Sequence, residues 1–255
     1  MNSIRQFFFN LIVVFLISQI HAQQNLPARC QHPEFPELRD NEIVIKHSGY
    51  SLVYNEKHEQ ASWVAYILTK KETQGTVKRV DRFIEDPNIP TGSASNADYN
   101  KSGYDRGHLA PAADMKWSQK VMEESFFFSN MSPQVPAFNR GVWKKLEEKV
   151  RDWAISYDSV LVVTGPILEN GLKTIGKNEV SIPNYYFKAL IDYKHKESKA
   201  IAFIIPNEGS TEPLKKFVCS IHELEARTGF NFFYQLEDHL ENTLEKQKCP
   251  SCWGL

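Results

Sequence analysis

The chain has 255 residues, of which 42% are hydrophobic and 24% are charged, as in an ordinary globular protein. This composition excludes collagen-like, disordered and multi-span membrane chains. The 30 Lys and Arg residues nearly balance the 31 Asp and Glu residues, so the net charge of −1 indicates no partner, and any polyanion binding must be local.

Residues 1–22 have the pattern of a secretory signal peptide. A single basic residue, Arg5, precedes an apolar run at residues 7–17, and a small residue stands at the predicted cleavage point. The run is shorter than the about 20 residues that span a bilayer. The bulky Ile20 leaves an uncleaved anchor as the alternative. We expect a secreted or periplasmic mature chain, residues 23–255, without stable membrane association after cleavage.

Export would place the four cysteines, Cys30, Cys219, Cys249 and Cys252, in an oxidising compartment, so we expect two disulfides. Three connectivities are possible, and the sequence does not choose among them. The pair in Cys249-Pro250-Ser251-Cys252 has the spacing of a redox motif. It lacks the strand and helix that such motifs use, which favours a structural role.

The first part of the mature chain predicts short strands. Runs of β-branched and aromatic residues, separated by turn residues, occur at residues 43–45, 50–54, 63–68 and 77–80. Residues 86–104 are rich in Pro, Gly, Ser, Asn and Asp, which predicts a loop. Binding groups collect on loops that a rigid scaffold holds.

The second part predicts a mixture of strands and helices. Strands are expected at residues 126–129, 159–164, 185–192 and 200–205, and helices at 139–154, 213–227 and 237–246. No internal repeat or linker divides the mature chain. We expect one α+β domain, its core at about residues 43–235, with a mostly antiparallel sheet layered with helices and a disulfide-bearing C-terminal tail.

Local charge is more informative than the total. Five basic residues stand against two acidic ones at residues 69–82, and nine against six at residues 101–151. Residues 222–248 carry an acidic excess of three. Such asymmetry fits a polyanion groove on one side of the molecule, with a solvated charged face as the alternative.

One stretch carries residues suited to phosphodiester cleavage. It contains Asp105-Arg106-Gly107-His108, then Asn130, then Asn139 and Glu147. Together these supply a base for water, a cation site and a phosphate clamp. His108 is the candidate general base, because neutral imidazole accepts a proton near pH 7. A structural role for each residue is the alternative.

Asn139 and Glu147 are eight residues apart on the predicted helix. They would lie about 80° apart around the axis and about 12 Å apart along it. One small cation could hardly bind both side chains directly, and Mg²⁺ often keeps several waters. We therefore expect one residue to bind the ion directly and the other through its water. The neutral amide oxygen of Asn139 suits the direct role.

The Asp105-Arg106-Gly107-His108 run resembles the hallmark of the DNA/RNA non-specific endonuclease family, and within it the endonuclease G branch. The likeness covers about residues 50–206. It includes Asn96-Ala97-Asp98-Tyr99, Trp117-Ser118-Gln119, Ser129-Asn130, residues 133–136, the helix at 139–147, Thr164-Gly165-Pro166 and Ile175-Gly176-Lys177.

The resemblance implies a ββα-metal (His-Me finger) active site that cuts single- and double-stranded DNA and RNA with little sequence preference. It implies that His108 is the general base. Asn139 would be the direct ligand of Mg²⁺, with Mn²⁺ or another divalent cation as the alternative. Glu147 would assist metal-bound water, Asn130 would support the site, and Arg106 would contact phosphate.

The family also uses an upstream arginine, for which Arg79 and Arg82 compete, with Arg79 fitting the spacing slightly better. The localisation and partners of mitochondrial family members are not transferred to this chain. The sequence does not decide whether the chain forms a homodimer. The glycosylation sequon at Asn130 is interpreted as coincidence.

Two other functions remain as alternatives: a non-catalytic nucleic-acid binder on the same fold, and a phosphodiesterase acting on smaller nucleotides. A serine hydrolase is excluded because the sequence has no G-x-S-x-G motif, and a zincin because His222-Glu223 has no second His at the required spacing.

Overall fold

A computed structural model describes residues 32–193 and 198–255. These ranges contain a seven-stranded sheet whose neighbouring strands are all antiparallel. Its strand order is β1 (Val44–Lys46), β2 (Ser51–Asn55), β3 (Gln60–Thr69), β6 (Ser159–Pro166), β9 (Tyr185–Asp192), β10 (Lys199–Pro206) and β11 (Val218–Cys219). This confirms the expected α+β class.

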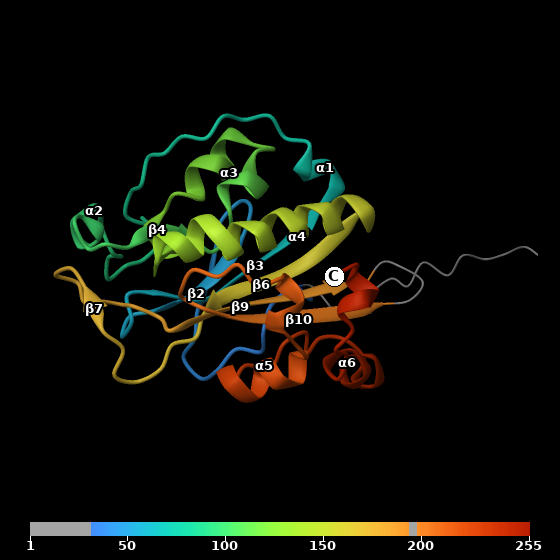
Figure 1. Ribbon diagram of the computed structural model, residues 1–255. Coiled ribbons are helices and arrows are strands. Elements are labelled where there is room, and N and C mark those ends of the chain that lie inside the picture. Colours follow the sequence, from blue (N-terminus) through green and yellow to red (C-terminus); the bar gives the residue numbers. More distant parts are fainter. Residues whose placement is uncertain (1–31, 194–197) are drawn as a thin grey trace, which may run out of the picture.

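Helices cover both faces of this sheet and give three layers (Figure 1). Helix α4 (Lys144–Ser156) packs on one face, and α5 (Ile221–Thr228) and α6 (Asp238–Glu245) pack on the other. The smaller elements are α1 (Lys70–Thr73), α2 (Asn96–Tyr99), β4 (Asp105–His108), α3 (Gln119–Glu124), β5 (Met131–Gln134), β7 (Thr174–Ile175) and β8 (Val180–Ser181).

Strand β6 lies inside the sheet and separates two hydrophobic cores. Val160 and Val162 belong to the core under α4, whereas Leu161 and Val163 belong to the core under α5 and α6. Successive residues of a strand point to opposite faces. Because helices cover both faces, all eight residues of β6 are buried. This explains the continuous apolar run from which the strand was predicted.

The predicted helix at residues 139–154 is present, but it begins irregularly. Phe138–Trp143 forms a π-helical turn in which Gly141 has non-helical dihedral angles, φ −107° and ψ −110°. Glycine reaches such angles because it has no Cβ. The regular helix α4 starts at Lys144 and buries one stripe, formed by Leu146, Val150, Trp153 and Ala154.

Two predicted strands are wrong. Residues 77–80 form no strand, and their apolar side chains, Val77 and Val80, instead pack against a small core under a loop. Residues 126–129 contain only an isolated bridge between Phe127 and Ile84, followed by a short 3₁₀ turn, Phe128–Asn130. The other predicted strands lie within β1, β2, β3, β6, β9 and β10 apart from one residue each at the starts of the first two.

The helix predicted at residues 213–227 is interrupted. Leu214–Phe217 is a 3₁₀ turn, and Val218–Cys219 then pairs with β10 as β11. A new helix, α5, begins after Ser220, whose hydroxyl accepts a hydrogen bond from the Glu223 amide, while the Glu223 carboxylate accepts one from the Ser220 amide. The helix predicted at 237–246 is confirmed as α6.

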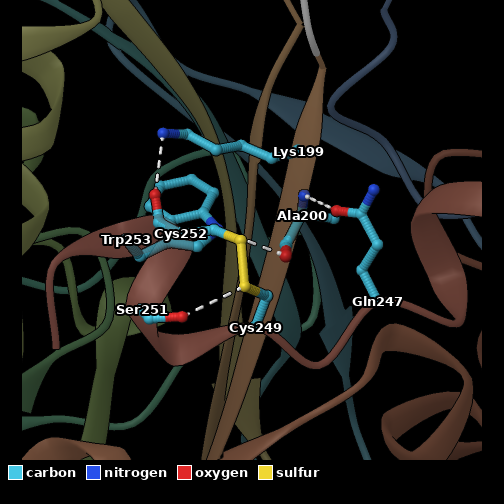
Figure 2. Close-up of a disulfide and its surroundings, with 7 residues drawn as sticks. All are labelled: Lys199, Ala200, Gln247, Cys249, Ser251, Cys252 and Trp253. Carbon is cyan, nitrogen blue, oxygen red and sulfur yellow. Dashed lines mark hydrogen bonds between the residues drawn. A yellow bond between two sulfur atoms is a disulfide. The ribbon is translucent and has the colours of Figure 1, made fainter.

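The C-terminal tail docks on β10 and carries a disulfide (Figure 2). Cys249 pairs with Cys252, and Trp253 donates a hydrogen bond to the carbonyl of Ala200 at 3.3 Å. Cys219 is buried with a free thiol, so the pairing expected for it is wrong. Cys30 and the predicted signal peptide lie outside the described residues. Within those residues, no helix combines the length and apolarity needed to cross a membrane.

Candidate active site

The sequence motif folds into a strand, a second strand and a helix. Strand β4 pairs antiparallel with β5, so that His108 lies opposite Met131 and Asp105 lies opposite Gln134. The π-helical turn and α4 follow β5 directly. Residues 105–108 and 139, which are separated by about thirty positions in the sequence, therefore meet in one ββα unit.

Gly107 allows the two strands to approach closely. A Cβ added at Gly107 would lie 2.1 Å from the side-chain Cδ of Gln134, well inside van der Waals contact. Any other residue would therefore displace Gln134, which is itself fully buried. The glycine in the motif keeps its two neighbours, Arg106 and His108, in register with β5.

His108 is buried between aromatic rings. Its side chain packs edge-on against Phe126, with ring centroids 4.8 Å apart, and against Phe83 at 5.9 Å. Burial, and secondarily the positive charge of Arg79, lowers the pKa of His108 to about 3. Its Nε2 atom is buried and has no hydrogen-bond partner within the described residues. The imidazole is thus neutral near pH 7.

Asn130 fixes the turn that follows His108. Its Oδ1 accepts a hydrogen bond from the Ala110 amide at 2.8 Å, and its Nδ2 donates to the carbonyls of Ala110 and Ser125 at 2.9 and 2.8 Å. All the hydrogen-bonding capacity of this buried amide goes to the backbone around the site. Such a side chain offers no accessible nitrogen for glycosylation.

Asn139 is joined to the same strand as His108. Its Nδ2 donates a hydrogen bond to Oδ2 of Asp105 at 2.9 Å, and Arg140 binds the same carboxylate through two hydrogen bonds of 2.8 and 2.6 Å. His108 lies three residues further along β4, about 10 Å at the usual rise of a strand. The Asp105 contact therefore joins the start of the helical segment to strand β4.

The residues present fit a divalent cation. Because a carboxylate only accepts hydrogen bonds, the Asn139 atom that faces Asp105 is the amide nitrogen, which leaves Oδ1 for a ligand. A neutral oxygen donor of this kind suits a hard ion such as Mg²⁺.

Glu147 lies in a partly buried cluster of charges under α4. Burial raises its pKa to about 7, while the positive charge of Lys188 acts in the opposite direction. Arg151 forms a 2.7 Å ion pair with Asp114 in the same cluster. The 80° offset expected between Asn139 and Glu147 assumed a continuous helix. It does not apply, because Gly141 interrupts the helix between them.

Two guanidinium groups lie on the aromatic rings that flank His108. Arg106 stacks over Phe83 at 5.4 Å and donates a hydrogen bond to Oδ1 of Asn100 at 3.0 Å. Arg79 stacks over Phe126 at 4.8 Å and forms an ion pair with Asp81. Both arginines are thus placed beside the base.

Three residues at or near the site were missed by sequence reasoning: Asp105, Gln134 and Lys188. Asp105 was part of the motif but received no role, although it holds both Asn139 and Arg140. The amide atoms of buried Gln134 and the amine of buried Lys188 have no hydrogen-bond partner in the described part of the chain. Unlike Asp105 and Gln134, Lys188 comes from a distant strand, β9, which no local pattern could connect to α4.

The placement of Arg79 predicts different effects for the two competing upstream arginines. We expect Arg79→Ala to lower kcat/KM about 10- to 100-fold, the value of one charged hydrogen bond to phosphate. The matched variant Arg82→Ala should change it by less than about threefold, as for an exposed side chain away from the base. Steady-state cleavage of a labelled DNA duplex measures both. If both variants lose kcat/KM equally, Arg79 has no larger role than Arg82.

Comparisons with known proteins place the chain among nucleases. Residues 28–239 match the sequence profile of the DNA/RNA non-specific endonuclease family. The chain is 36% identical to mitochondrial nuclease EXOG of Danio rerio over 208 residues, which cover 75% of the chain and 61% of that protein. It is 36% identical to mitochondrial endonuclease G of Homo sapiens, with 72% and 67% covered.

One further nuclease and one solved structure are also similar to the chain. A nuclease of Syncephalastrum racemosum is 37% identical over 218 residues, covering 76% of the chain and 68% of that protein. The crystal structure of the EndoG/EndoGI complex superposes with a TM-score of 0.76 at 31% identity, covering 88% of the chain and 99% of that chain. The chain spans about three fifths of the length of the EXOG relative.

Proposed function

The chain belongs to the DNA/RNA non-specific endonuclease family, and from this membership and the ββα geometry we propose that it is an exported, divalent-metal-dependent endonuclease that cuts both DNA and RNA. One observation carries the proposal. A neutral, buried His108 with an unpartnered nitrogen lies on the same short strand as Asp105, the residue that orients the amide of Asn139.

The chain's own residues perform the acid–base part of the reaction. A water molecule attacks phosphorus with an oxygen lone pair, its proton passes to the imidazole of His108, and the bond from phosphorus to the leaving oxygen breaks, with a proton from solvent going to that oxygen. A positioned general base contributes about 10²- to 10⁴-fold to such a reaction. Asn130 keeps the imidazole in place through the turn that it holds.

Asn139 Oδ1 would hold the cation, Mg²⁺ in our proposal, and Glu147 would orient waters of its hydration shell. When bound, this ion supplies Lewis-acid stabilisation of the charge that develops on the phosphate and on the leaving oxygen. The support for Asn139 is its fixed amide, and the support for Glu147 is its place beyond the π-helical turn on the same helical segment.

Substrate binding would depend on phosphates rather than on bases. Arg106 and Arg79 flank the base, and bidentate guanidinium groups suit phosphate oxygens. Phosphate contacts are common to DNA and RNA, so they favour little sequence preference. Affinity should then fall steeply as salt rises, because binding releases counterions.

We also propose that the chain is secreted or periplasmic and acts as one domain after removal of residues 1–22. The signal-like N-terminal sequence supports export. The Cys249–Cys252 disulfide supports an oxidising compartment. Both features contrast with the mitochondrial location in the names of several relatives.

A gel assay with a metal series tests the proposal. We expect the purified chain to degrade plasmid DNA and RNA in MgCl₂ and to leave both intact in EDTA, because the ion stabilises the transition state. Dinucleotides serve as the matched small substrate and should be cleaved far more slowly. Equal cutting in MgCl₂ and EDTA would refute the metal role, and faster dinucleotide cleavage would reassign the substrate.

A further inference from the structure

The acidic segment at residues 222–248 has no part in the nuclease chemistry proposed above. It folds into α5, α6 and the turn that follows, on the sheet face opposite α4 (Figure 1). The two helices lie side by side there, in contact with each other and with β10. Any function of this segment is therefore separate from the ββα unit.

Three metal-ligating side chains converge where α5 meets α6. His222 and Glu225 are three residues apart on α5, which places them on one face of the helix. Glu245, the last residue of α6, faces them. One ligand atom from each of the three residues lies within 4.8 Å of the other two. The ligand atoms of a four-coordinate Zn²⁺ are about 3.4 Å apart, so small side-chain rotations would complete the site.

The core anchors each of these side chains through its neighbour in the sequence. His222 follows Ile221, Glu225 follows Leu224, and Glu245 follows Leu244. These three aliphatic neighbours are at most 2% exposed and belong to the core under the helices. The backbone positions of the three polar residues are thus fixed by packing. A site built this way needs little ordering when a ligand binds.

Among the described residues, no lysine or arginine side chain forms an ion pair with the carboxylates of Glu225 or Glu245. Burial, and secondarily the negative charge of Glu245, raises the pKa of Glu225 to about 7. Two basic side chains of the segment point to other carboxylates: Lys248 binds Glu223 at 3.0 Å, and Arg227 binds Glu169 at 2.7 Å. A divalent cation would compensate the negative charge of Glu225 and Glu245, which these two ion pairs do not neutralise.

We propose that His222, Glu225 and Glu245 bind a divalent transition-metal cation of the Zn²⁺ class, which joins α5 to α6. One imidazole and two carboxylates match this class, whereas Mg²⁺ and Ca²⁺ prefer oxygen ligands alone. Water would complete the coordination. The site is distinct from the proposed catalytic site and does not depend on the proposed function.

Binding of the metal alone tests the proposal. The full mature chain, freed of metal and kept oxidised so that Cys249 and Cys252 offer no thiolates, is titrated with ZnCl₂ by calorimetry and in a thermal unfolding assay. We expect the wild-type chain to bind one Zn²⁺ at this junction and its Tm to rise by about 5 °C or more at 100 times Kd. MgCl₂ at the same concentration should give a much smaller shift.

Matched variants locate the ion. His222→Ala and Glu245→Gln should each weaken Zn²⁺ binding about 10- to 100-fold and remove most of the Tm shift. His239→Ala, on the same helix α6 but outside the set, should change Kd by less than about threefold. Wild-type binding by His222→Ala overturns the proposal. The proposal is also overturned if His108→Ala loses Zn²⁺ binding while the junction variants keep it, because the ion would then belong to the proposed catalytic site.

Discussion

Replacing His108 by Ala is expected to lower kcat by about three orders of magnitude while the affinity for nucleic acid changes by less than about threefold. In the proposed mechanism His108 acts only in the transition state, so its removal should leave substrate binding almost intact. The buried ring contacts Phe126 and Phe83 but makes no hydrogen bond through Nε2 within the described residues. Single-turnover cleavage and a filter-binding assay measure the two quantities separately.

The control for this variant is His239→Ala, which removes a histidine on the remote helix α6. It should keep wild-type kcat. Circular dichroism of His108→Ala should match the wild-type spectrum, which separates lost chemistry from lost folding. Full activity in His108→Ala would show that another group takes the proton from water.

The low pKa of His108 also predicts a pH effect on stability. Burial lowers this pKa from 6.5 to about 3, so between these two values the unfolded chain binds more protons than the folded chain. The free energy of unfolding should then rise with pH, by up to about 1.4 kcal/mol per pH unit from this residue. The contribution of His108 to the free energy of unfolding is fully present above pH 6.5 and is lost as the pH falls toward about 3. Urea titrations of wild type and His108→Ala at pH 4 and pH 7 would reveal the difference.

Replacing Asn139 by Ala should remove the direct oxygen ligand for the cation. We expect kcat to fall by about two orders of magnitude or more at standard MgCl₂, and the MgCl₂ concentration for half-maximal cleavage to rise. Asp105→Asn should cause a smaller loss of the same kind, because the amide of Asn139 would lose the carboxylate that orients it. Metal titrations of the cleavage rate measure both effects.

Asn170→Ala provides the matched control, since Asn170 is an exposed residue whose side chain only accepts a hydrogen bond from Lys57. Its metal dependence should equal that of the wild-type chain. Unchanged cutting and metal dependence in Asn139→Ala would assign the cation to other residues.

Much of the scaffold could be predicted from the sequence because its signals are local. The apolar run at residues 159–164 predicted a strand buried on both faces, and β6 is one. The helical spacing of Leu146, Val150 and Trp153 predicted α4. The prediction failed at residues 77–80, where apolar side chains serve a loop instead of a sheet. Hydrophobic periodicity records burial, and it does not reveal whether a strand partner is present.

The site was less predictable because its contacts are long-range. No local pattern links Asp105 with Asn139, and the two residues meet because β4 pairs with β5. The sequence favoured Arg79 over Arg82 only slightly, because it does not show that the guanidinium of Arg79 lies over the ring of Phe126. The burial of Glu147 beside Lys188 depends on strand β9, more than forty positions along the chain.

The docking of the tail on β10 bears on how firmly helix α4 is held in the folded chain. The indole N–H of Trp153, on α4, donates a 2.8 Å hydrogen bond to the carbonyl of Trp253, 100 residues later, and the two rings meet edge-on at 4.9 Å. A nascent chain that has not yet reached Trp253 leaves that buried donor unsatisfied, at a cost of about 1–3 kcal/mol. Contacts between such distant residues form late. The end of α4 is therefore secured only once the tail has docked, and a chain shortened before Trp253 should unfold at a lower urea concentration than the full chain.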